Sequence, residues 1–203
     1  MRRGEEFSIM SGPIELMNSR MSNSEKVLAS AACERLAGRK GVRMLIGGLG
    51  MGFTLRAALA ELPADAQVVT AELVPEVVAW ARGPMAHIFE GSLEDPRVTI
   101  EEADVGRLIA QAASGYDAIL LDVDNGPGGL SREENDSLYS VEGLRAAAKA
   151  LSPGGLLAVW SSGPSDAFAR RLRTTGYQVE EIRVHAHRKG KGARHIIWIA
   201  TKA

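Results

Sequence analysis

Apolar and polar positions change their spacing along this chain at regular intervals. Short apolar runs, such as AILLDV at 118–123 and LLAVW at 156–160, alternate with longer stretches whose apolar residues recur at helical spacing. The two runs are apolar almost throughout, which is typical of strands buried on both faces of a parallel sheet. The pattern predicts strands at 42–47, 67–72, 97–101, 117–122, 155–161, 177–185 and 193–201. It predicts helices at 24–37, 54–62, 75–83, 105–113, 138–151 and 165–175.

Both ends of the chain depart from this alternation. Apolar and polar residues alternate on either side of Ser11-Gly12, which predicts a small β-hairpin. The last two strands are separated by the basic turn RKGKG, with no helix between them, so we expect an antiparallel pair. The sequence therefore predicts an α/β, Rossmann-like fold. Its seven-stranded, mostly parallel sheet ends in an antiparallel hairpin and is flanked by helices. We divide the chain into an N-terminal hairpin and flap (1–23) and a main domain (24–203).

Composition narrows the possible partners. The 203 residues carry a formal net charge of −1, which gives no electrostatic attraction to nucleic acid or to a membrane surface. The N-terminus has no apolar run like that of a signal peptide, and no apolar stretch reaches the length of a membrane span. The single cysteine, Cys33, suits a reducing compartment, so we expect a cytoplasmic protein. The four histidines show no spacing typical of a metal site, and we expect no metal.

The most informative segment is VRMLIGGLGMGFTLRAAL, residues 42–59. It is typical of a buried strand, a glycine-rich turn and a helix whose free N–H groups point at the turn. Glu72 follows near the end of the next strand, where a carboxylate can accept both hydroxyl groups of a ribose. The glycine spacing does not fit the dinucleotide pattern G-x-G-x-x-G, and no Gly-Lys-Ser/Thr marks a P-loop. A nucleoside-binding domain is the resulting hypothesis.

Each candidate acid also has a purely structural interpretation. Glu72 and Asp104 precede predicted helices and can cap them. Asp122 and Asp124 lie in DVDNGPGG, where Asn125-Gly126 strongly favours a turn. Acids at the carboxyl edge of a parallel sheet nevertheless lie where ligands bind.

Further along, the motifs EEADVGRL, YDAILLDVDNGP and LYSVEGLRAAAKALSPGGLLAVWSS follow the glycine loop in order. With IGGLGMG and AELVPEVVAWAR, this succession resembles the class I S-adenosylmethionine-dependent transferases, and Gly48, Gly50 and Gly52 match their G-x-G-x-G loop. Within that superfamily the chain is most similar to the spermidine synthase (polyamine aminopropyltransferase) family, over roughly residues 14–203. The resemblance implies the class I methyltransferase fold and a homodimer.

The resemblance also implies roles for individual residues. Asp122, with Asp124 in the loop after it, matches the acids that face the reacting centre. Acceptor contacts are expected from Asp124, Asn125, Glu25 and Tyr139, although Tyr139 can also simply pack at the start of a helix. Glu72 corresponds to the ribose acid, and Asp104 to the acid at the adenine amino group. The full cofactor-binding set is Gly47, Gly48, Leu49, Gly50, Met51, Glu72, Leu73, Asp104, Val105 and Asp122.

Two departures concern the substrates. The family carries an acid in its glycine loop that contacts the amino end of the cofactor, and here that position falls on Met51 or Gly50. The family's Tyr-x-Glu-Met segment appears as Ser24-Glu25-Lys26-Val27, in which Glu25 can substitute for the missing acid. The surrounding polar cluster MNSRMSNSE is either a flap over the cofactor or a solvated loop that caps the next helix.

Three functions follow. The leading one is aminopropyl transfer from decarboxylated S-adenosylmethionine to a small-molecule amine, with release of methylthioadenosine. Displacement beside a sulfonium requires the amine in line and a carboxylate to take its proton. The second is methyl transfer from intact S-adenosylmethionine, giving S-adenosylhomocysteine. The third is a non-catalytic nucleoside-binding module.

Overall fold

The computed structural model describes residues 1–112, 114–123, 125–127, 137–187 and 191–202. Its central feature is a seven-stranded sheet in the order β6-β5-β4-β7-β8-β10-β9. The first five of these strands in space run parallel, and β10 pairs antiparallel with both β8 and β9. The predicted sheet with its antiparallel final pair is confirmed. Its strands are β4 (Arg43–Gly47), β5 (Gln67–Glu72), β6 (Val98–Glu102), β7 (Tyr116–Leu121), β8 (Leu151–Ser161), β9 (Tyr177–His187) and β10 (Lys191–Lys202).

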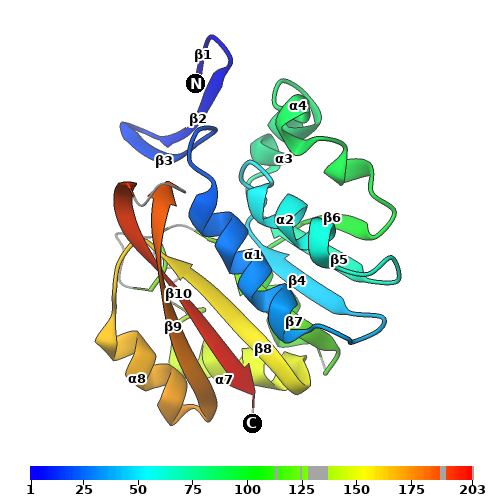
Figure 1. Ribbon diagram of the computed structural model, residues 1–203, viewed down its shortest axis with the longest axis vertical. Helices are drawn as coiled ribbons and strands as arrows, with labels where there is room; N and C mark the ends of the chain where they lie inside the picture. Colours follow the sequence, from blue (N-terminus) through cyan, green and yellow to red (C-terminus); the bar gives the residue numbers. More distant parts are fainter. Residues whose placement is uncertain (113, 124, 128–136, 188–190, 203) are drawn as a thin grey trace.

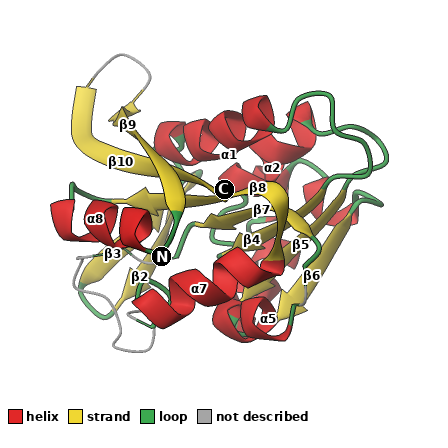
Figure 2. Cartoon of the chain, turned by 90° about the horizontal axis from the view of Figure 1, so that it is seen from below, coloured by secondary structure: helices red, strands yellow, loops and turns green. Residues whose placement is uncertain are grey.

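Helices cover both faces of this sheet, as Figure 2 shows from below. One face packs against α1 (Asn23–Arg35), α2 (Phe53–Glu61) and α3 (Pro75–Arg82). The other packs against α5 (Val105–Gln111), α7 (Val141–Ala150) and α8 (Asp166–Thr174). This three-layer arrangement follows from strands that are apolar on both sides.

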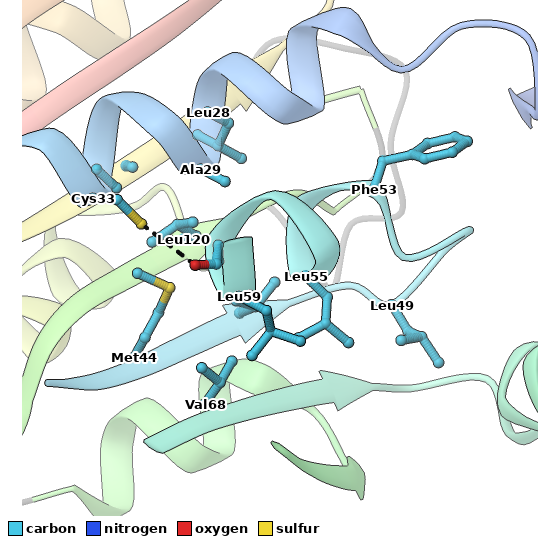
Figure 3. Packing of buried hydrophobic residues seen from close by; sticks show 14 of the residues in the cluster. Leu28, Ala29, Cys33, Met44, Leu49, Phe53, Leu55, Leu59, Val68 and Leu120 are labelled. Atoms are coloured by element: carbon cyan, nitrogen blue, oxygen red, sulfur yellow. Dashed lines mark hydrogen bonds between the residues drawn. The ribbon is translucent and has the colours of Figure 1, made fainter. Parts of the chain in front are cut away.

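The core between α1, α2 and the sheet is built from small and branched side chains that allow close approach. Figure 3 shows Leu28 and Cys33 on α1, whereas Leu55 and Leu59 lie on the side of α2 that is turned away from α1, toward the sheet. Sγ of Cys33 lies 4.0 Å from the carbonyl oxygen of Ala58, a weak contact across the two helices. Cys33 is therefore a packing residue, and burial raises the pKa of its thiol to about 12.

The N-terminal segment forms its own small antiparallel sheet, which lies beyond the start of α1 (Figure 1). The predicted hairpin is present as β2 (Glu6–Ser11) and β3 (Ile14–Asn18), and a two-residue strand β1 (Arg2–Arg3) extends it. The division of the chain at residue 23 remains a prediction.

Several boundaries differ from the prediction. Strand β8 begins at Leu151 rather than at 155, and the predicted helix 138–151 begins only at Val141, where the side chain of Ser140 accepts from Gly143 N–H. The β7–β8 register shifts between Tyr116 and Ala118, so the Pro153-Gly154 segment bulges within the strand instead of ending it. The short helices α4 (Ala86–Phe89) and η1 (Ser92–Glu94) were not predicted, because neither is long enough to show helical periodicity.

Candidate functional site

The glycine-rich turn is held between the carboxyl ends of two strands. Gly48 N–H donates to the carbonyl of Ala71 at 2.8 Å, and Asp122 N–H donates to the carbonyl of Gly47 at 2.9 Å. Gly48 has a φ of +92°, and a Cβ there would lie 2.3 Å from the carbonyl oxygen of Asp122. Only glycine fits this position, so the turn is fixed at the sheet edge where α/β domains bind their ligands.

Glu72 ties the end of β5 to this turn. Its Oε2 accepts from Leu49 N–H at 3.0 Å, and its Oε1 accepts from Val74 N–H at 2.9 Å. Each oxygen keeps a second lone pair, and the two backbone donors fix the direction of the carboxylate. The arrangement suits a carboxylate that receives two vicinal hydroxyl groups. Leu73, beside it, is 45% exposed and can cover a planar base.

Asp104 precedes α5 and is exposed. Its Oδ1 accepts from Arg107 N–H at 2.8 Å, so the expected capping role is confirmed. Contact of Asp104 with adenine remains a prediction. Val105 is buried against Gly47, where an added Cβ would lie 3.0 Å from its side chain. Val105 thus limits the space behind the turn.

The N-terminal sheet reaches the turn through Met17 of β3. The N–H of Met51 donates to the sulfur of Met17 at 3.2 Å, and a Cβ on Gly50 would lie 3.0 Å from that sulfur. The side chain of Met51 is itself completely buried in the core. In this chain, position 51 therefore lines the turn with its backbone alone, and Gly50 adds no side chain.

Beyond the turn, two acids, Glu25 and Asp122, influence each other through their charges. Glu25 lies in the first turn of α1 and receives a 2.8 Å hydrogen bond from the hydroxyl of Ser24. Asp122, just after β7, receives one of 2.6 Å from the hydroxyl of Thr54. Burial and the charge of Glu25 raise the pKa of Asp122 to about 7, against the lowering effect of Thr54. Burial also raises the pKa of Glu25, while Ser24 and Lys26 act to lower it.

No lysine or arginine in the described part of the chain forms an ion pair with Glu25, Asp122 or Glu72. Buried carboxylates are normally paired, because taking a charge out of water is costly. Glu25 and Asp122 lack a basic partner at the ligand-binding edge of the sheet, and they are therefore suited to bind a cationic ligand.

The other residues predicted to contact the acceptor are Asp124, Asn125 and Tyr139, and each has a different structural environment. Asp124 lies outside the described residues. Asn125 is placed by its carbonyl, which accepts from Ser162 N–H at 3.1 Å and so ties the loop after β7 to the end of β8. Tyr139 is buried and packs edge-on against Phe168, with ring centroids 5.6 Å apart. Packing, its alternative interpretation, is confirmed, and its contact with an acceptor remains a prediction.

Sequence reasoning did not identify Thr54, Met17 or His195 as parts of this site. Thr54 had a usable signal, since it follows the glycine turn directly at the start of α2. Met17 begins the MNSRMSNSE cluster that was considered as a flap over the cofactor, whereas His195 had no signal, because its position depends on how β10 lies relative to α1. Nδ1 of His195 lies 2.9 Å from Oγ of Ser24, 171 positions away in sequence.

The sequence predicted neither a metal site nor a membrane span. Among the described residues, no group of three or more His, Cys, Asp or Glu residues is arranged to hold a metal ion. None of the helices in that part of the chain is both long and apolar enough to cross a membrane.

The chain is similar to known proteins of one family. No family model matches the chain. A polyamine aminopropyltransferase of Mycobacterium tuberculosis is 36% identical over 152 residues, which are 70% of this chain and 28% of that protein. The chain thus spans less than a third of the curated relative that it matches. The resemblance to the spermidine synthase family predicted from the motifs is confirmed.

Solved structures show the same fold. Spermidine synthase from Thermotoga maritima superposes with a TM-score of 0.73 at 19% identity, covering 94% of this chain and 62% of that one. A spermidine synthase in complex with the transition-state analogue AdoDATO also gives 0.73 at 19%, covering 94% and 63%. The predicted fold class is confirmed.

Proposed function

We propose that this chain, a relative of the polyamine aminopropyltransferases with the fold of the spermidine synthases, moves an aminopropyl group from decarboxylated S-adenosylmethionine to a small-molecule amine. The observation that carries the proposal is that two acids near the glycine turn, Glu25 and Asp122, form no ion pair with a lysine or arginine of the described residues. A polyamine is cationic at neutral pH, so its charge compensates these carboxylates and contributes to its binding.

In this proposal, different residues of the site bind the donor and deprotonate the acceptor. Glu72 would receive the ribose hydroxyls of the donor, and the backbone at 47–51 would lie against its methionine-derived part. The sulfonium group of the donor makes its neighbouring carbon electrophilic. Glu25 or Asp122 would take a proton from the acceptor's ammonium group, which leaves a free amine held for in-line attack. As the new C–N bond forms, the C–S bond breaks and its electrons neutralise the sulfonium to a thioether, methylthioadenosine.

The raised pKa of Asp122 fits this role. A general base works best when its pKa is near the working pH, and burial together with Glu25 moves Asp122 in that direction. Asp124, outside the described residues, remains part of the proposal as a second loop acid. We also keep the homodimer and a cytoplasmic location as predictions.

Methyl transfer on the same fold is the second candidate, and one observation favours it. The side chain of Met51 is buried and Gly50 has none, so neither supplies an acid for the free amino end of a decarboxylated donor. The products would then be S-adenosylhomocysteine and a methylated acceptor.

Titration calorimetry separates these functions. Aminopropyl transfer requires tighter binding of decarboxylated S-adenosylmethionine than of the intact form, and formation of methylthioadenosine when 1,4-diaminobutane is added. Tighter binding of the intact form, with S-adenosylhomocysteine as the product, contradicts our proposal. If neither donor binds, the chain is not a transferase of this type.

A further inference from the structure

A chain of hydrogen bonds connects β10 to the carboxylate pair. Nδ1 of His195 lies 2.9 Å from Oγ of Ser24, and Ser24 donates to Oε2 of Glu25 at 2.8 Å. Ser24 is 1% exposed, so water does not compete for its hydroxyl group. The three residues come from two elements, α1 and β10, that meet only in the folded protein.

The direction of this chain follows from the number of protons. The hydroxyl of Ser24 has one hydrogen, and it is donated to Glu25. Oγ must therefore accept at its other contact, so Nδ1 of His195 carries a hydrogen and donates it. Both bonds then point toward the carboxylate, and each strengthens the other.

The ring of His195 is held in place independently of Ser24. It packs edge-on against Trp160 of β8, with ring centroids 4.7 Å apart. Nearby, the side-chain amide of Asn23 donates to the backbone carbonyl of His185 at 2.8 Å, which joins the start of α1 to β9. The position of α1 therefore does not depend on the bond between Ser24 and His195 alone.

We propose that His195 and Ser24 are positioning residues that keep Glu25 ionised and oriented to bind and deprotonate the amine acceptor. Burial raises the pKa of Glu25, whereas Ser24, which accepts from His195, and Lys26 of the same helix lower it; the charge of Glu25 in turn acts on Asp122 at the end of β7. A negative charge on Asp122 disfavours ionisation of Glu25. The hydrogen bonds from His195 to Ser24 and from Ser24 to Glu25 favour it. The inference deepens the proposed transferase activity and rests on it for the identity of the acceptor.

Two substitutions of His195 test this role. His195→Phe keeps a flat ring against Trp160 but removes the Nδ1 donor. His195→Asn places an amide donor near the same point. Asn23→Ala is the matched control, because it removes a contact between α1 and the sheet without touching the chain to Glu25.

The first measurement needs no activity. Carbon-13 NMR of the unliganded protein, labelled at glutamate carboxyl groups, follows the titration of Glu25 with pH. We expect the titration midpoint of Glu25 to rise in His195→Phe, since the Ser24 hydroxyl loses the donor behind it and then donates less strongly to Glu25. His195→Asn and Asn23→Ala should stay near the wild type. An unchanged midpoint in His195→Phe overturns the proposal.

The second measurement uses catalysis with 1,4-diaminobutane as acceptor. His195→Phe should raise KM for the amine about tenfold and move the acid limb of the pH profile to higher pH, with His195→Asn restoring both. Ser24→Ala should act alike, and the double variant should be no worse than either single one. If the effects of His195→Phe and Ser24→Ala add up in the double variant, His195 does not act on Glu25 through Ser24.

The two measurements also separate the inference from the function on which it rests. If the wild type transfers no aminopropyl group while the Glu25 midpoint still shifts, the proposed function fails and the positioning role stands. If the transfer occurs and the midpoint does not move, only the positioning role fails. Should His195→Phe not fold, Ser24→Ala carries the same NMR test.

Discussion

The hydroxyl of Thr54, in the first turn of α2, donates a 2.6 Å hydrogen bond to Oδ2 of Asp122 at the end of β7. Thr54 is 3% exposed and Asp122 is half-buried, so this bond replaces part of the hydration that Asp122 loses on folding. It is the contact by which the helix after the glycine turn controls the charge of an acid at the proposed reacting centre.

Thr54→Val tests that control, because valine keeps the shape and removes the hydroxyl. Asp122 then loses its donor, and its pKa should rise further above about 7, by about one unit for a bond to a charged group. The acid limb of the activity profile should move to higher pH by the same amount. Thr54→Ser keeps the donor and should resemble the wild type. Equal profiles for the valine and serine variants would show that the bond does not set the charge of Asp122.

The pH dependence of stability reports on Asp122 without any substrate. Its pKa is raised by folding, so the folded state binds more protons than the unfolded state between about pH 4 and pH 7. The contribution of Asp122 to the free energy of unfolding therefore falls as the pH rises through this range, and it is smallest near pH 7. Each unit of raised pKa corresponds to about 1.4 kcal/mol.

Asp122→Asn should remove that slope. Urea unfolding of the variant and the wild type at pH 5 and pH 7.5 measures it, and the variant should gain stability relative to the wild type at the higher pH. Asp166→Asn, which changes an acid in the first turn of α8, serves as the control. A parallel pH dependence in Asp122→Asn and the wild type would refute the raised pKa.

The fold and the glycine turn could be predicted because their signals are local. Strand periodicity, the turn at Gly48 and the acid at Glu72 lie within 30 residues of one another, and each reflects a backbone requirement. The bulge in β8 was missed because proline and glycine usually end a strand, whereas here the β7 register shift absorbs them.

The carboxylate pair could be predicted only in part. Glu25 and Asp122 were each selected by the family resemblance, but their mutual effect depends on how α1 lies on the sheet. No role was predicted for His195, because sequence gives no sign that β10 places it against Ser24. The direction in which Met51 points was equally inaccessible, since a residue in a glycine turn has no periodicity to reveal its face.

Glu72→Gln should weaken nucleoside binding. An amide has one acceptor oxygen, so its NH₂ group must face one of the two N–H donors, Leu49 or Val74, and the alignment for the ribose is lost. We expect the Kd for methylthioadenosine to rise at least about tenfold, corresponding to ~1.4 kcal/mol. Glu76→Gln, at an exposed position in α3, is the matched control and should change Kd less than about twofold. Equal effects of the two substitutions on calorimetric Kd would exclude Glu72 from the ribose site.

Gly48→Ala should destabilise the protein as well as the site. An alanine there must adopt a φ of +92° and place its Cβ 2.3 Å from the carbonyl oxygen of Asp122, which forces the turn away from β7. We expect a loss of more than about 2 kcal/mol, which lowers the Tm of a chain of this size by roughly 4 to 8 °C. Gly163→Ala provides the control near the end of β8, because its added Cβ meets no atom within 4 Å. Calorimetric unfolding measures both variants. A Gly48→Ala protein that melts with the wild type and binds methylthioadenosine normally would show that the turn does not require glycine at this position.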